Sequence, residues 1–92
     1  MEAGSSVGTP CPLTMPTVFR SGPYRFFFYS ADRAEPSHVH VERGNSVAKL
    51  WLDPVRLGAS RGFGAPELRQ LEKLVRLNET FLLRAWHDFF SD

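Results

Sequence analysis

The sequence is poor in cysteine and has no long apolar run. Cys11 is the single cysteine among 92 residues, so no disulfide can form within the chain, which fits the reducing cytoplasm. The longest apolar runs, such as that from Phe26 to Tyr29, are far too short to cross a bilayer. Neither a basic residue nor a continuous hydrophobic region precedes Arg20, so no signal peptide is predicted. We therefore expect a cytoplasmic protein that makes no membrane contact.

An excess of one charge sign is also absent. Eleven Lys and Arg residues stand against ten Asp and Glu residues, which gives a net charge of +1. Binding to nucleic acid would therefore need a local basic patch rather than the field of the whole molecule. The sequence also has no Gly-Lys-Ser/Thr phosphate loop and no Ser/His/Asp or Cys/His nucleophile pattern. No cofactor is predicted.

Aromatic residues are missing from the first fourteen positions. All eight Phe, both Tyr and both Trp residues follow Thr14, whereas residues 1–14 are rich in Gly, Ser and Pro. This composition predicts a disordered N-terminal extension over residues 1–14. Met15 opens the stretch MPTVFR, and we expect the physiological start there. Residues 15–92 are expected to form a single domain, because a chain that is 42% hydrophobic can build one modest core over this length.

The first part of this domain is predicted to form two hairpins. β-branched and aromatic residues fill four runs, and turn-forming Gly, Pro, Asn and Ser residues separate them. The runs are TVFR (17–20), YRFFFYS (24–30), HVHVER (38–43) and SVAKLWL (46–52). Gly44 and Asn45 suit a tight turn between the last two runs, which would align His40 with Lys49 and His38 with Trp51. We expect four antiparallel strands.

The remainder is predicted to be a loop and one long helix. Residues 53–64 contain one Pro and three Gly, which is typical of a loop. From Ala65 to Phe90 apolar residues recur at helical spacing, with Pro66 in the first turn and Asn78 interrupting the stripe, where the helix can kink. The expected fold class is α+β, a four-stranded antiparallel sheet with one C-terminal helix on one face.

The alternation of side chains along the second hairpin divides the sheet into two faces. Five apolar residues share the face that the helix should cover, namely Val39, Val41, Ala48, Leu50 and Leu52. The other face collects an aromatic and polar set, which is typical of a binding surface. We predict that Tyr29, His38, His40, Lys49 and Trp51 on this face bind a small protein partner or a second copy of the chain. Alternatively, the N-terminal segment or residues 53–64 cover this face.

The His-x-His-x-Glu pattern also suggests chemistry. His38, His40 and Glu42 offer two imidazoles and a carboxylate, which are ligands that zinc and non-haem iron use. Against a metal site, Lys49 is expected directly across from His40, where its charge would repel a cation. A second alternative is a small ribonuclease or RNA-binding domain in which His38 or His40 is the general acid or base and Arg20 and Arg25 stabilise phosphate charge. We favour a binding module over an enzyme.

The same segments resemble the small bacterial family known as domain-of-unknown-function family 4160. MPTVFR, YRFFFYSADRAEPSHVHVERG, AKLWLDPVRL and ELRQLEKLVRLNETFLLRAWHDFF carry the resemblance, which spans Met15 to Phe90. Its most specific part is Pro36 to Val41, where members commonly have Pro-Pro-His and this chain has Ser37 between Pro36 and His38. The resemblance supports Met15 as the start and implies one half of a toxin–antitoxin-like pair. The residues that match the family motifs are Phe19, Arg20, Tyr24, Phe26, Phe27, Tyr29, His38, His40 and Trp86.

Overall fold

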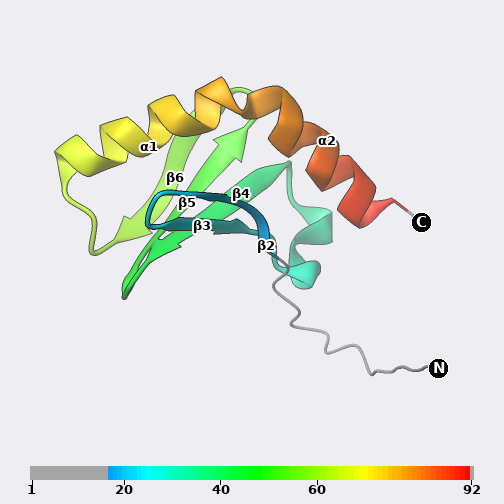
Figure 1. Cartoon of the computed structure of the whole chain (residues 1–92). Coiled ribbons are helices and arrows are strands. Elements are labelled where there is room, and N and C mark those ends of the chain that lie inside the picture. The colour runs from blue at the N-terminus through cyan, green and yellow to red at the C-terminus, as the bar shows by residue number, and fades with distance from the viewer. Residues whose placement is uncertain (1–16, 92) are drawn as a thin grey trace.

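The computed structural model describes residues 17–91, and the predicted disordered extension over residues 1–14 lies outside them. The described chain forms one antiparallel sheet with two α-helices on one face, so the predicted α+β class is confirmed (Figure 1). The strands follow one another across the sheet in the order β2-β3-β4-β5-β6. Their bounds are β2 Thr17–Ser21, β3 Tyr24–Phe27, β4 His38–Arg43, β5 Ser46–Leu52 and β6 Val55–Arg61.

The second hairpin has the predicted register. His40 pairs with Lys49 and His38 pairs with Trp51 across β4 and β5. Gly44 at the turn has a φ of 59°, a left-handed conformation that glycine adopts without steric cost. The expected division into two faces therefore holds along this hairpin.

The sheet has five strands rather than the four that were predicted. Residues 55–61, predicted to be part of a loop, form β6 and pair with β5 along one edge of the sheet. Their glycine content misled the prediction, because Gly58 lies where the register shifts between Lys49 and Leu50. A Cβ at Gly58 would lie 3.0 Å from Nε1 of Trp51, so the glycine makes room for the indole within a bulged strand.

The single long helix that was predicted is two helices. α1 spans Ala65–Leu77, α2 spans Glu79–Phe90, and Asn78 separates them. The interruption that the sequence indicates at Asn78 is therefore a break. Its side chain donates to the carbonyl of Leu74 over 2.8 Å and closes the end of α1. Neither helix of the described chain is long and apolar enough to cross a membrane.

The core lies between the helices and one face of the sheet. Leu71 and Val75 of α1 and Leu82 of α2 are fully buried, each contributing on the order of 1.5–3 kcal/mol by leaving water. The five apolar residues predicted for the covered face are all buried, as are Phe26 and Phe28, and the complete face comprises Phe26, Phe28, Val39, Val41, Ala48, Leu50 and Leu52. The predicted core face is confirmed.

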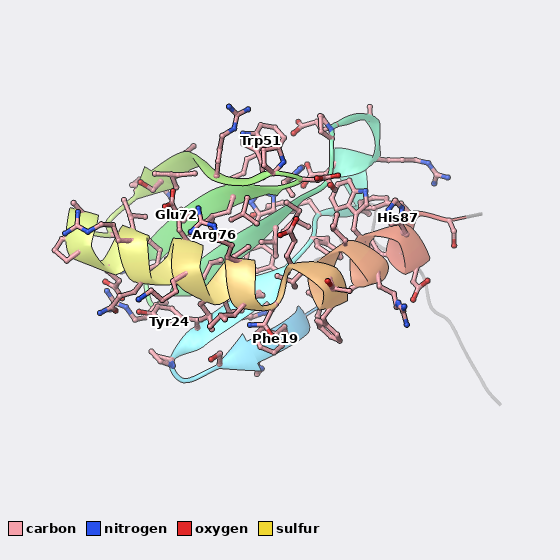
Figure 2. The ribbon with its side chains drawn as sticks, turned by 90° about the horizontal axis from the view of Figure 1, so that it is seen from above. Phe19, Tyr24, Trp51, Glu72, Arg76 and His87 are labelled. Atoms are coloured by element: carbon pink, nitrogen blue, oxygen red, sulfur yellow. The ribbon has the colours of Figure 1, made fainter. Side chains whose placement is uncertain are left out.

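Polar contacts attach α1 to the two hairpins. Tyr24 donates to Oε2 of Glu67 over 2.6 Å, and Arg43 donates to both carboxylate oxygens of Glu67 over 2.8 Å. Figure 2 shows Tyr24 beside α1, on the side of the first hairpin, and Phe19 beside the junction of the helices, where its ring lies 5.8 Å from that of Phe81. These contacts hold the first helix across the strands. Among residues 17–91, both α-helices lie on this face of the sheet, and the opposite face has no α-helix (Figure 1).

Candidate functional site

A short helical turn between β3 and β4 folds towards the histidines. The 3-10 helix η1 spans Ser30–Ala34, at the same end of the sheet as α2 (Figure 1). Backbone hydrogen bonds from Asp32 to Tyr29 and from Glu35 to Asp32, both 3.0 Å long, fix its shape. Glu35 then returns the chain to extended backbone, and Pro36 follows it before β4. This turn places the carboxylate of Asp32 over β4.

Asp32, His38 and His40 form one cluster. The Nε2 atom of His38 lies 2.8 Å from Oδ2 of Asp32, and the Nε2 atom of His40 lies 2.9 Å from the same oxygen. The potential ligand atoms of the three residues all lie within 4.8 Å of one another. A carboxylate between two imidazoles can orient a proton-transfer pair or provide ligands to a divalent cation.

The hydrogen bonds of His38 determine which ring nitrogen carries a proton. Nδ1 lies 2.9 Å from the carbonyl oxygen of Pro36, which can only accept, so Nδ1 must be the donor. In neutral His38 the proton is then on Nδ1, and Nε2 has a lone pair facing Asp32. An ionised Asp32 also offers only lone pairs, so this contact needs either a second proton, on Nε2 of His38, or a cation between the two atoms.

Burial distinguishes the two histidines. The sequence predicts that both belong to an exposed binding face, but His38 is fully buried. Its ring lies 5.4 Å from that of Trp51 and 5.1 Å from that of Trp86, between centroids. η1 and α2 both reach this end of the sheet, which the prediction did not anticipate (Figure 1). His38 is therefore an internal residue and cannot contact a partner directly.

His40 is partly exposed and held by aromatic rings. The ring of Phe27 stacks on it at 5.5 Å, and the ring of Tyr29 meets it edge-on at 4.6 Å. Burial lowers the pKa of His40 below its ordinary value, and the hydrogen bond that His40 donates to Asp32 only partly opposes this effect. His40 is therefore mainly a neutral imidazole at pH 7.

The charges around the cluster are balanced by specific pairs. Burial acts to raise the pKa of Asp32, but the hydrogen bonds from His40 and His38 outweigh it, so the pKa of Asp32 lies below its ordinary value. Lys49, expected to repel a cation near His40, has its Nζ 2.7 Å from Oε1 of Glu35 and 4.6 Å from the centre of the Trp51 ring. Its charge is therefore partly neutralised by Glu35.

A groove of about 490 Å³ opens beside this cluster on the face opposite the α-helices. We call it the open-face groove. Its walls combine aromatic rings, small side chains and two cations, and no carboxylate lines it. The lining residues are Phe27, Tyr29, His40, Val47, Ala48, Lys49, Ala59, Ser60 and Arg61.

The structure brings three of the predicted binding residues together and separates the others. Tyr29, His40 and Lys49 line the open-face groove, whereas His38 is buried. Trp51 lines a different hollow of about 260 Å³. Figure 2 shows Trp51 at the side of the sheet away from β2.

The other chemical candidates are engaged elsewhere. Glu42, considered as a metal ligand, accepts from Arg25 over 3.1 Å instead of joining the histidines. Arg25 also donates to Thr17 and lies over the ring of Phe27 at 4.4 Å. Arg20 is exposed and lies opposite Arg25 in the register of β2 and β3. Neither arginine lines the open-face groove.

Sequence reasoning missed Asp32, the acidic member of the cluster. It lies six positions before His38 in the stretch ADRAEPS, interpreted as a loop with no periodicity to assign a direction to any side chain. The one available signal was an acidic residue between two strands that become neighbours in the sheet. Arg61 was missed because its strand was interpreted as a loop.

Comparison with known proteins identifies one relationship. The family model described as a domain of unknown function, DUF4160, matches residues 24–87. This span includes Asp32, both clustered histidines and most of the strands and helices. No curated protein and no solved structure matches the chain.

Proposed function

Because the chain belongs to the DUF4160 family, whose function is unknown, we propose a role from the geometry: a protein-interaction module that binds its partner in the open-face groove. The partner is a small protein, as in a toxin–antitoxin-like pair, and a second copy of this chain is the alternative partner. The binding residues are Tyr29, His40 and Lys49 together with Arg61.

The open-face groove is the observation that supports this proposal. It combines aromatic surface with cationic groups, and protein interfaces are enriched in aromatic and Arg residues. It also adjoins β6, which is an edge strand of the described sheet. An extended segment of a partner can add to such an edge through its backbone while its side chains enter a neighbouring groove. An acidic segment would complement Lys49 and Arg61.

Affinity purification from native cells, followed by mass spectrometry, tests the proposal. The tagged full chain is compared with Arg61→Glu in the groove and with Arg69→Glu on the exposed side of α1. We expect a stoichiometric partner with the unmodified chain and with Arg69→Glu, and about tenfold less with Arg61→Glu, because charge reversal at an interface opposes binding. Equal recovery with both variants would refute the groove as the interface, and light scattering identifies a homodimer.

RNA binding is a second candidate, favoured by the absence of carboxylates from the groove lining. Aromatic rings beside cations are also the features with which proteins bind single-stranded nucleic acid. A fluorescent RNA oligonucleotide titrated at 50 and 200 mM salt separates the candidates. The affinity for RNA should fall steeply as the salt concentration rises, whereas the affinity of an aromatic protein interface should change little.

A further inference from the structure

We propose that Asp32, His38 and His40 bind a divalent transition-metal ion through Oδ2 of Asp32 and the Nε2 atoms of both histidines. The set differs from the His-x-His-x-Glu pattern in the sequence because Glu42 is paired with Arg25. Two imidazoles and one carboxylate are the ligand types of zinc and non-haem iron sites. The proposal is independent of the identity of any partner in the open-face groove.

The orientation of His38 is that of a metal-binding imidazole. Its Nδ1 donates to the carbonyl of Pro36 over 2.9 Å, which leaves the Nε2 lone pair directed at Asp32. A backbone carbonyl on one ring nitrogen is the usual partner of a histidine that binds metal through the other. A metal ion bound here would take the place of the proton between Nε2 of His38 and Oδ2 of Asp32.

The spacing of the ligand atoms also suits a metal ion. Oδ2 of Asp32 lies 2.8 Å and 2.9 Å from the two Nε2 atoms. Adjacent ligands at right angles around an ion with bonds of about 2.1 Å lie about 3 Å apart. The two Nε2 atoms lie within 4.8 Å of each other, so small side-chain shifts would bring the three ligand atoms around one ion.

The charged side chains around the cluster favour a bound cation. Asp32 and Glu35 contribute two negative charges near the site, and Lys49 contributes one positive charge that is paired with Glu35 at 2.7 Å. These three side chains together carry about one net negative charge, which favours a cation. The repulsion by Lys49 that the sequence suggests is therefore reduced by its ion pair.

The site is held in place by neighbouring rings and is accessible from solvent. The His38 ring is fixed among Trp51, Trp86 and His40, so its orientation is determined before binding. Asp32 is 16% exposed and His40 is 17% exposed in their side chains, and His40 lines the open-face groove. Three protein ligands leave coordination positions for water or a ligand from the groove.

Metal titration of the tag-free full chain tests this assignment. After EDTA treatment and desalting, Zn²⁺ is titrated by calorimetry and Co²⁺ by visible absorption, which reports its ligands. We expect one equivalent of each ion, with a Co²⁺ spectrum that shows nitrogen and oxygen coordination. A chain that binds neither ion with a dissociation constant below about 100 µM refutes the proposal.

Three variants assign the site. Asp32→Asn and His40→Ala should each weaken Zn²⁺ binding at least about tenfold, because each removes a ligand, whereas His87→Ala, on the exposed side of α2, should leave it unchanged. Circular dichroism establishes that each variant is folded. If Asp32→Asn does not fold, His40→Ala decides alone. Full affinity in the folded ligand variants, or loss in His87→Ala, would place the metal elsewhere and overturn the assignment.

Discussion

At the scale of single residues, His38 shows how one imidazole can be internal and still polar. It is fully buried, yet both ring nitrogens have partners, Pro36 on one side and Asp32 on the other. A buried polar group is tolerated only when its hydrogen bonds are made. His38 therefore stabilises the end of the sheet at the same time as it orients the cluster.

This dual role predicts a large stability loss for His38→Ala. The change leaves a cavity between two indole rings and removes one of the two histidine partners of Asp32, so the free energy of unfolding should fall by about 2–4 kcal/mol. Urea unfolding in EDTA measures it. His87→Ala on the exposed side of α2 is the control and should change stability by less than about 0.5 kcal/mol. If His38→Ala lowered the free energy of unfolding by no more than His87→Ala does, the imidazole of His38 would not be needed for the stability of the fold.

At the scale of elements, one carboxylate connects the first helix with both hairpins. Glu67 accepts from Arg43 and from Tyr24, and these bonds, that from Arg43 first, hold the pKa of Glu67 below its ordinary value. The same hydrogen bond acts on Tyr24 in the opposite direction, because donating to Glu67 raises the pKa of the Tyr24 hydroxyl. The helix is thus positioned by a charged contact as well as by its apolar stripe.

The depressed pKa of Glu67 predicts a pH-dependent contribution to stability. The contribution is present above the unfolded-state pKa of about 4.3 and is lost as the pH falls through the lower pKa of the folded state. We expect Glu67→Gln to lower the melting temperature by a few degrees at pH 7 and by progressively less towards pH 3. Thermal scans across this range measure the difference. For Glu72→Gln, further along α1, the difference in melting temperature from the unmodified chain should not shrink towards pH 3. If the difference for Glu67→Gln stayed constant with pH, the pKa of Glu67 would not contribute to stability.

At the scale of the whole molecule, the described core is built within residues 26–86. Every strand pairs with its neighbour in sequence, so the sheet forms from successive hairpins and the helices then cover one face. Local connections of this kind allow a small domain to complete its core without help from distant segments. We propose that residues 15–92 are sufficient for the fold.

A chain that begins at Met15 tests this proposal. We expect its melting temperature to lie within about 2 °C of that of the full chain, since a change of 1 kcal/mol would shift it by about 4–8 °C in a domain of this size. Differential scanning calorimetry of both chains makes the comparison. A larger drop would show that residues 1–14 contribute to the folded domain.

The sequence by itself determined the second hairpin and the two faces of the sheet. Alternation has a period of two residues and the Gly44–Asn45 turn fixes the register, so local rules suffice to separate Val39 and Val41 from His40. The resemblance to the family likewise depends on local sequence, and the family model that matches residues 24–87 confirms the family. The interruption at Asn78 was visible, although its outcome as two helices was not.

Only the tertiary structure decided what covers His38 and what completes the cluster. Asp32 has no periodic pattern to give its direction, and its contact with the histidines depends on how η1 folds over β4. The pairing of β6 with β5 and the arrival of Trp86 beside His38 are also contacts between distant parts of the chain. Such contacts follow from packing of the whole domain, because no local preference of an isolated segment specifies them.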